Sequence, residues 1–241
     1  MSDAASIAVV VLLVGWAVWG VLAWPPLKRA LAAGDRTALT AEYRLTIIGE
    51  VVLAALAFGA AAWAGFGIVR ASQGLAIGSA IGVGALQPPV LAGVGTAIVG
   101  GVIGIVVARR SGKAPQLAGD IAALLPETTT ERRWFAAVCV CVGVCEELLY
   151  RGFMGGWLSD IGLNGVAVLV IGSVFFGLAH SYQGASGVAA TTMLGALLHV
   201  LYVGTGSIWV PIVLHILLDL RLLLIVPTRL AGGITGGTTA N

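Results

Sequence analysis

Long runs of hydrophobic residues, separated by short polar segments, dominate the chain. A helix that crosses a membrane needs about 20 predominantly apolar residues. Because the bilayer interior forces the backbone to satisfy its own hydrogen bonds, such runs predict helices. The pattern therefore predicts an all-α fold, a polytopic transmembrane bundle of about seven spans, which cover residues 5–24, 51–69, 90–108, 134–158, 162–181, 187–203 and 208–226.

An eighth apolar segment, residues 74–86, is short and ends just before Pro88 and Pro89. Its glycines recur every fourth residue, which gives a smooth face for close helix packing. The segment is re-entrant, interfacial or a short span, and we interpret it as a Gly-rich helix that does not cross. We expect three regions, an N-terminal transmembrane region (1–126), a catalytic core (127–226) and a disordered C-terminal tail (227–241).

The polar segments between the runs indicate the orientation, because basic residues favour the cytoplasmic side. With seven spans and an external N-terminus, only Arg70 of the loop cations lies outside. The C-terminus is then cytoplasmic, and residues 28–44 and 113–133 are polar cytoplasmic loops. Thr128 and Glu131 have the spacing of a capping box, which predicts a helix start before the fourth span. The cations predicted inside are Lys28, Arg29, Arg36, Arg44, Arg109, Arg110, Lys113, Arg132, Arg133, Arg221 and Arg229.

Composition narrows the class of protein further. Of the 241 residues, 59% are hydrophobic and only 10% are charged, which excludes a soluble enzyme and a disordered chain. A net charge of +2 is too small for a nucleic-acid-binding surface, so the lipid bilayer is the expected partner and nucleic acid is not. The first run lacks a basic segment before it and a clear cleavage site, so we interpret it as a retained span.

A few ionisable residues fall inside the predicted spans. A charge at the centre of a span costs roughly 2.5–3.5 kcal/mol on insertion scales, so such residues are expected to pair, to face the bundle interior and to mark a function. The chain has 13 basic residues, and within the spans the only one is Arg151. The other ionisable side chains placed within spans are Glu146, Glu147, Asp219, His180, His199 and His215.

The fourth span carries two adjacent glutamates that point about 100° apart on a helix. Glu147 and Arg151 stand at i, i+4 in the favourable order for an ion pair. Glu146 lies on the face of Tyr150 and keeps a freer carboxylate, which suits a general base. A purely structural clamp would explain Glu147 and Arg151 but would leave Glu146 without a role.

Two later spans each carry a polar pair at helical spacing. Phe176 and His180 lie one turn apart on the fifth span, and His215 and Asp219 lie one turn apart on the seventh. We expect Asp219 to accept a hydrogen bond from His215 or to help hold a ligand. His199, on the sixth span, fits no pair, and we interpret it as structural.

This ordered set of pairs resembles the CPBP family of intramembrane proteases, also called the type II CAAX prenyl endopeptidase or Abi family. The family pattern is EExxxR, then FxxxH, then HxxxN or HxxxD on later helices. The corresponding residues here are Glu146, Glu147 and Arg151, then Phe176 and His180, then His215 and Asp219. The resemblance covers roughly residues 127–226, and the ordered set is more specific than any one motif.

The resemblance implies hydrolysis of a peptide bond within or just under the bilayer. Glu146, assisted by His180, would activate a water molecule, and His215 and Asp219 would stabilise the oxyanion or position the site. Glu147 and Arg151 would support the cavity, and Tyr150 and Phe176 would contact the substrate. The family is described both as glutamate-dependent and as metalloproteases, so the cofactor is either none or a divalent metal such as zinc.

A zinc site would use Glu146, His180 and His215, which supply a carboxylate and two imidazoles, with water in the fourth position. Many family members carry Asn where this chain has Asp219. An ionised Asp cannot donate to an oxyanion, so Asp219 is protonated, orients His215 or binds the metal. The implied substrate is a membrane protein or peptide, in a bacterial-type plasma membrane. Neither its prenylation nor the oligomeric state follows from the sequence.

Three alternatives remain open at this stage. The string around Ser186 matches the GxSG motif of rhomboid serine proteases, with His215 as the base, but it leaves Glu146 unused. A proton- or metal-coupled transporter would also use buried acids and histidines, although we find no inverted repeat. A scaffold of the same fold would bind membrane partners without catalysis.

Overall fold

The structure is a computed structural model that describes residues 2–64 and 121–224, with a few helical residues between 95 and 111. All regular structure in these residues is helical. Short 3-10 turns at residues 122–124, 181–183 and 221–224 join the main helices. The main helices are α1 (Ser2–Ala32), α2 (Thr37–Ala64), α5 (Thr129–Glu147), α6 (Gly155–Asp160), α7 (Gly165–Ala179), α8 (Gly184–Thr205) and α9 (Trp209–Leu220).

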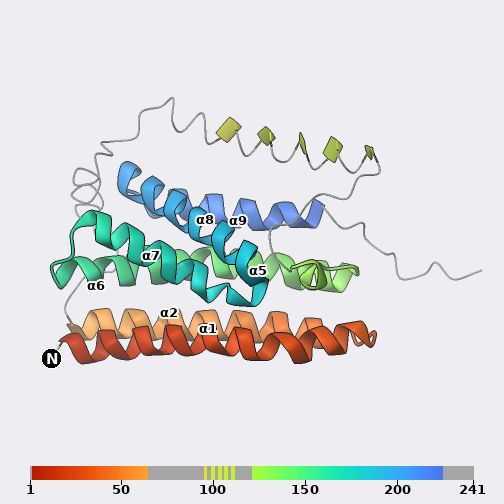
Figure 1. The fold of residues 1–241 in the computed structure, drawn as a ribbon, viewed down its shortest axis with the longest axis horizontal. Helices are drawn as coiled ribbons and strands as arrows, with labels where there is room; N and C mark the ends of the chain where they lie inside the picture. The colour runs from red at the N-terminus through yellow and green to blue at the C-terminus, as the bar shows by residue number, and fades with distance from the viewer. Residues whose placement is uncertain are drawn as a thin grey trace, which may run out of the picture.

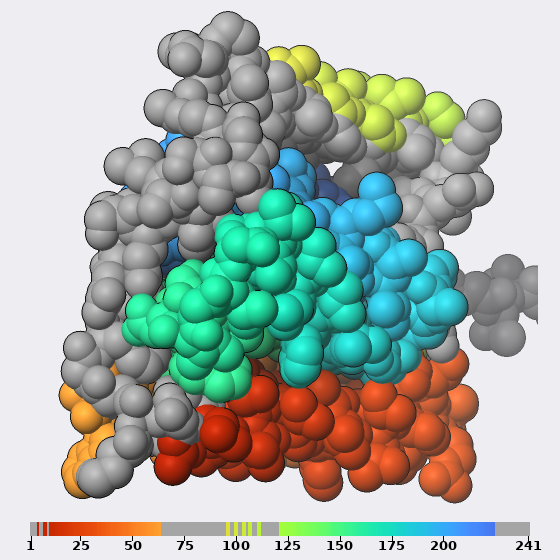
Figure 2. Space-filling view, turned by 60° about the vertical axis from the view of Figure 1, so that its left-hand side comes forward, coloured from red at the N-terminus to blue at the C-terminus, as the bar shows by residue number. Residues whose placement is uncertain are grey.

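Helices α1 and α2 lie side by side and form one layer beneath the helices of the C-terminal half (Figure 1). In the space-filling view, α1 covers one side of the molecule, and α6, α7 and α8 lie directly against it (Figure 2). One hydrophobic core joins the two layers, because Leu13 of α1 and Leu53 of α2 pack in the same cluster as Phe153 and Phe176. The N-terminal helices therefore complete the core around the C-terminal ones.

The helical membrane fold is confirmed in its class, but the number of spans is not. Three helices are long and apolar enough to cross a membrane, namely Val10–Ala32, Thr37–Trp63 and Ser181–Thr205, and Gly165–Ala179 is a shorter apolar helix. Many large hydrophobic side chains on these helices are exposed, as expected for a surface in contact with lipid. Seven spans stay a prediction, and the segment 74–86 and the tail 227–241 lie outside the described residues.

The predicted polar loop at residues 28–44 is wrong. Helix α1 continues through Lys28 and Arg29 to Ala32, and α2 begins at Thr37, so only residues 33–36 form the turn. Long basic side chains can bury their stems and extend their charges to the interface, so a helix need not end where its apolar run ends. As a consequence Glu50, placed just outside the predicted second span, lies midway along α2.

The predicted capping box at the start of α5 is confirmed. The Thr128 side chain accepts from the Glu131 backbone N–H, and the Glu131 side chain accepts from the Thr128 backbone N–H. Arg36, in the turn between α1 and α2, donates to Glu131 at 2.6 Å and to the Leu125 carbonyl at 3.1 Å. The beginning of α2 is thereby fixed to the beginning of α5.

Two further contacts show that α2 and α5 run parallel from this point. The rings of Tyr43 and Phe135 meet edge to face with centroids 5.8 Å apart. Further along, the Cys141 thiol donates to the Ile47 carbonyl, with 3.8 Å between sulfur and oxygen. The next turn brings Glu50 level with the residues just before Glu147, where the polar side chains gather.

Candidate active site

The polar motif of the fourth predicted span lies where α5 changes its helical geometry. Residues Leu148–Met154 form a π-helix, and α6 follows without a break. Such wide turns are rare and occur frequently at functional sites. Tyr150 and Arg151 lie in this segment, and both are buried. The sequence contains no periodic signal for a single wide turn, and we had predicted an ordinary helix.

The predicted ion pair between Glu147 and Arg151 forms, and it has a third member. Arg151 Nη1 lies 2.9 Å from Glu147 Oε1, and His215 Nδ1 lies 2.9 Å from the same oxygen. Arg151 also donates from Nη2 to the Gly195 carbonyl of α8 at 2.8 Å. All three side chains are almost fully buried, so this group ties α5, α8 and α9 together.

His215 lies between three carboxyl groups. Its Nε2 atom is 3.9 Å from Glu146 Oε2 and 3.7 Å from Asp219 Oδ2, while Nδ1 is bound to Glu147. The expected hydrogen bond between His215 and Asp219 is therefore wrong, because 3.7 Å suits an ion pair and exceeds hydrogen-bond range. The closest partner is Glu147, which fixes the ring and directs Nε2 toward Glu146 and Asp219.

His180 lies at the C-terminal end of α7, where its Nδ1 atom is 2.8 Å from the Phe176 carbonyl. A carbonyl oxygen can only accept, so Nδ1 carries a proton and Nε2 holds the lone pair of the neutral ring. The ring stacks at a tilt against Phe176, with centroids 4.9 Å apart. The sequence pair of Phe176 and His180 thus has a backbone hydrogen bond as well as a ring contact.

Phe176 is the common neighbour of the polar side chains. Its buried ring meets Tyr150 at 5.2 Å and His215 at 5.8 Å between centroids, and Arg151 Cζ lies 4.6 Å from its centre. Gly195 makes room for it, because a Cβ there would lie 3.1 Å from a Phe176 ring carbon. The structure brings Glu146, Glu147, Arg151, His215 and Asp219 together around His215 and joins His180 to them through Phe176.

His199 stays apart from these contacts. It is buried in α8 and meets Tyr202 edge to face, with centroids 6.3 Å apart, and its Nε2 atom has no hydrogen-bond partner. Ser186, the nucleophile of the rhomboid alternative, is exposed in the first turn of α8. Neither residue shares a hydrogen bond or ion pair with Glu146 or His215 among the contacts of the described residues.

The described side chains do not fit a metal centre. No group of three or more His, Cys, Asp or Glu side chains in residues 2–64 and 121–224 could hold a metal ion. Two of the nitrogens that a zinc site would need, Nδ1 of His180 and Nδ1 of His215, are already bound to Phe176 and Glu147. We therefore derive no step of the chemistry through a metal.

Two residues of the site escaped the sequence analysis. Glu50 of α2 is buried, and its Oε1 atom accepts a hydrogen bond from Trp16 Nε1 of α1 at 3.0 Å. Glu50 interacts electrostatically with both Glu146 and His215. The available signal was a carboxylate directly before an apolar run, which we had assigned to the end of a span.

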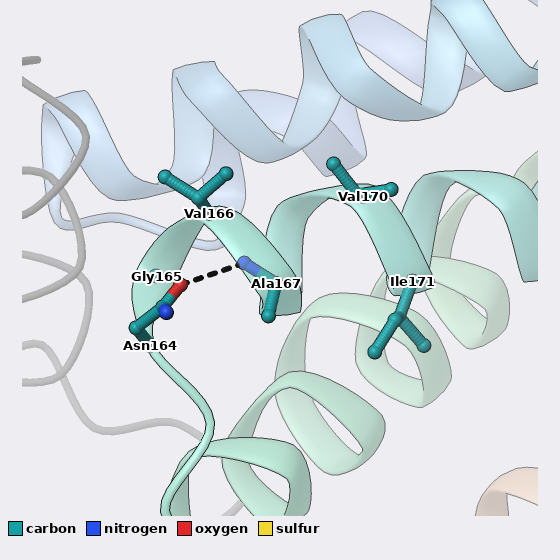
Figure 3. Close-up of a pocket in the computed structure, with 6 residues that line it drawn as sticks. All are labelled: Asn164, Gly165, Val166, Ala167, Val170 and Ile171. Carbon is teal, nitrogen blue, oxygen red and sulfur yellow. Dashed lines mark hydrogen bonds between the residues drawn. The ribbon is translucent and has the colours of Figure 1, made fainter.

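An apolar hollow of about 660 Å³ lies elsewhere, along the first turns of α7 (Figure 3). Asn164 at its edge caps α7 by accepting from the Ala167 backbone N–H at 3.0 Å. The residues that line it are Asn164, Gly165, Val166, Ala167, Val170 and Ile171, none of which belongs to the polar site.

The helices and their buried charges define a helical integral membrane protein with an ionisable site between its helices. Residues 129–221 match the family model of the Rce1-like type II CAAX prenyl endopeptidases, so this part of the chain belongs to that family. The resemblance seen in the motifs is thereby confirmed. The family is a protease family, which supports protease activity here. No curated protein and no solved structure gave a match to the chain.

Proposed function

We propose that the protein is an intramembrane endopeptidase that hydrolyses a peptide bond of a membrane-associated protein or peptide. The observation that carries this proposal is the arrangement of His215. Glu147 holds its Nδ1 atom, and its Nε2 atom lies between Glu146 and Asp219 in a buried site. An oriented imidazole beside a carboxylate without a hydrogen-bond partner on its inner oxygen can move a proton and stabilise charge.

In the proposed reaction, Glu146 and the Nε2 lone pair of His180 take a proton from a water molecule that attacks the peptide carbonyl. Proton transfer by a positioned side chain contributes roughly 10²–10⁴-fold to a rate. The Nε2–H of His215 faces the developing oxyanion, and Asp219, at ion-pair distance from that nitrogen, orients the ring. The proton then passes to the leaving amine. Tyr150 and Phe176 border the space that the substrate would enter.

The position of the site supports a substrate cleaved close to the membrane surface. His215 lies six residues before Arg221, which is about 9 Å along a helix. The family match suggests a CAAX-type protein, whose attached lipid would lie in the bilayer. We propose that the protein resides in a bacterial-type plasma membrane, with this basic end toward the cytoplasm.

The decisive experiment compares the wild type with Glu146→Gln in proteoliposomes, using a lipidated CAAX reporter peptide as the probe. The variant should lose cleavage while it accumulates to the same level. Glu42→Gln, the same change in α2, is the matched control and should cleave normally. Cleavage by Glu146→Gln at the wild-type rate would refute the proposal, and ion flux that depended on Glu146 would favour a transporter.

Because the described donors do not gather around a metal position, we expect the chemistry to be metal-independent. Cleavage of the reporter should be unchanged after dialysis against a strong divalent-metal chelator. Loss of cleavage with chelator, and its recovery when zinc is added back, would show that Glu146, His180 or His215 changes its partners to bind the ion.

A further inference from the structure

Glu50 is a buried carboxyl group with only half of its hydrogen bonds satisfied. Its side chain belongs to a residue that is 4% exposed, and Oε1 accepts from Trp16 Nε1 at 3.0 Å. Its Oε2 atom is buried without a hydrogen-bond partner among the described residues. An unsatisfied buried polar atom is costly and uncommon, so this oxygen calls for an explanation.

The packing of α1 against α2 is shaped to hold Trp16 beside Glu50. A Cβ atom at Gly49 would lie 2.0 Å from the Trp16 ring, so only glycine leaves space for the indole there. The ring thereby presents its Nε1–H to the neighbouring carboxyl group. A glycine and a donor placed together in this way fix the direction of the Glu50 side chain.

The same side chain faces the polar site of the C-terminal half. Helices α2 and α5 run parallel, with the Cys141 thiol bound to the Ile47 carbonyl one turn before Glu50. Glu50 interacts electrostatically with Glu146 of α5 and with His215 of α9. The inner Oε2 atom of Glu146 is also buried without a partner. Two unsatisfied carboxyl oxygens therefore belong to side chains that face the same site.

The charges around these two oxygens do not balance if every acid is ionised. The carboxyl groups are Glu50, Glu146, Glu147 and Asp219, whereas the cations are Arg151 and, when protonated, His215. Burial of an uncompensated charge is expensive, so the surplus is removed by bound protons. On Glu50 the proton must lie on Oε2, because Oε1 already accepts from Trp16.

We propose that Glu50, held by Trp16, is a positioning residue of the active site that donates a hydrogen bond from Oε2 toward the Glu146 carboxylate. A protonated carboxyl group can donate and an ionised one can accept, so one proton satisfies both oxygens. The hydrogen bond orients the general base. This inference rests on the proposed protease function, and it assigns a role to α1 and α2, which lie outside the matched residues 129–221.

The test compares Glu50→Gln with Glu50→Leu in the full-length protein, using the lipidated reporter peptide. The Gln amide can still donate, so Glu50→Gln should retain most of kcat. Leu cannot donate, and loss of a hydrogen bond to a charged group should lower kcat about tenfold with KM unchanged. Glu42→Gln and Glu42→Leu are the matched controls in α2 and should leave both constants unchanged. Equal losses in the two Glu50 variants, or none, would overturn the proposal.

If Glu50→Leu does not accumulate, Trp16→Phe tests the same contact, because it removes the donor to Oε1 and keeps an aromatic ring. It should also lower kcat at constant KM, and an unchanged kcat would contradict the role of Trp16.

Infrared spectroscopy of the reconstituted protein at neutral pH separates this inference from the protease function, since it needs no substrate. The carbonyl band of a protonated carboxylic acid should be present in the wild type and in Glu42→Gln. It should be weaker in Glu50→Gln, and an unchanged band there would refute a proton on Glu50. Failure of the protease proposal would instead appear as absence of cleavage with this band intact.

Discussion

Glu147 is the acceptor on which the buried charges depend, because one of its oxygens binds both Arg151 and His215. Neither partner is accessible to water, with side chains 2% and 4% exposed. A buried ion pair of this kind gives little net stability, whereas removal of one member leaves an uncompensated charge. The pair therefore matters chiefly as a constraint on where His215 can lie.

Arg151→Met should strand the Glu147 carboxylate in the core and lower the free energy of unfolding by about 3–5 kcal/mol. The measurement is the thermal unfolding midpoint in detergent. Arg133→Met, which changes an exposed cation on the same helix, should leave the midpoint unchanged. If the two variants unfold together, the buried pair does not constrain the fold.

The local partner of Glu147 was predictable and the distant one was not. Arg151 stands four residues away, so helical spacing alone indicated the pair. His215 is 68 residues away, and only the packing of α9 against α5 brings it to the same oxygen. The spacing of His215 and Asp219 suggested a hydrogen bond within α9, but the ring is held by the distant glutamate instead. Glu50 escaped for the related reason that its partners lie on other helices.

Glycines set how closely the helices that carry the site approach one another. At Gly143, a Cβ atom would lie 2.5 Å from Ile216 Cγ1 and 3.1 Å from the Ile216 backbone nitrogen. Since the backbone cannot yield as a side-chain tip can, an added methyl group would displace α9 from α5. His215 is the neighbour of Ile216, so this contact sets the distance from the imidazole to Glu146.

Gly143→Ala should therefore cost about 1–3 kcal/mol of stability through overpacking and should also lower kcat for the reporter peptide. Gly59→Ala is the matched control, because nothing lies within 4 Å of a Cβ at that position in α2. It should keep full activity and gain up to about 1 kcal/mol from the better helix propensity of Ala. Normal kcat in Gly143→Ala would show that α9 has freedom to adjust.

The start of α5 should make stability sensitive to acid. Burial works to raise the pKa of Glu131, but hydrogen bonds from Arg36 and from the Glu127 and Thr128 backbones outweigh it and lower the pKa. A lowered pKa means that this stabilisation is present above the ordinary value of about 4.3 and is lost as the pH falls through the folded-state value. Glu131→Gln should be less stable at neutral pH and should lose less stability on acidification.

The unfolding midpoint measured from pH 7 downward checks this expectation. Asp160→Asn, which changes an exposed acid at the end of α6, should follow the wild-type curve. A Glu131→Gln curve parallel to that of the wild type would assign the acid sensitivity to other groups.

Helices were easier to predict than their ends. Each apolar run in the described residues became a helix, because the bilayer leaves few other ways to satisfy the backbone. The ends differ where side chains rather than hydropathy decide. Lys28 and Arg29 stay helical beyond their apolar run, and the π-helix at residues 148–154 leaves no mark on the pattern. The predicted division at residue 126 stays a prediction, since α1 and α2 share one core with the C-terminal helices.

Basic side chains gather at one end of the molecule, which gives the fold a direction in the membrane. The turn at residues 33–36 meets the start of α5 through Arg36, and Arg132 donates to the Leu223 carbonyl beyond α9 at 2.7 Å. α5 and α6 together lead away from this end to Asp160, so the turn after α6 lies at the other end (Figure 1). Because cations favour the cytoplasmic side, the basic end should face the cytoplasm.

Cysteine labelling in intact bacterial cells tests this orientation, starting from a variant in which Cys139, Cys141 and Cys145 are replaced by Ala. Ala33→Cys and Ile161→Cys place exposed thiols at opposite ends of the bundle. A membrane-impermeant maleimide should label Ile161→Cys directly, but Ala33→Cys only after the cells are permeabilised. The reverse pattern would place the polar site near the outer surface, and substrates would then have to approach from outside, which a lipidated cytoplasmic protein cannot do.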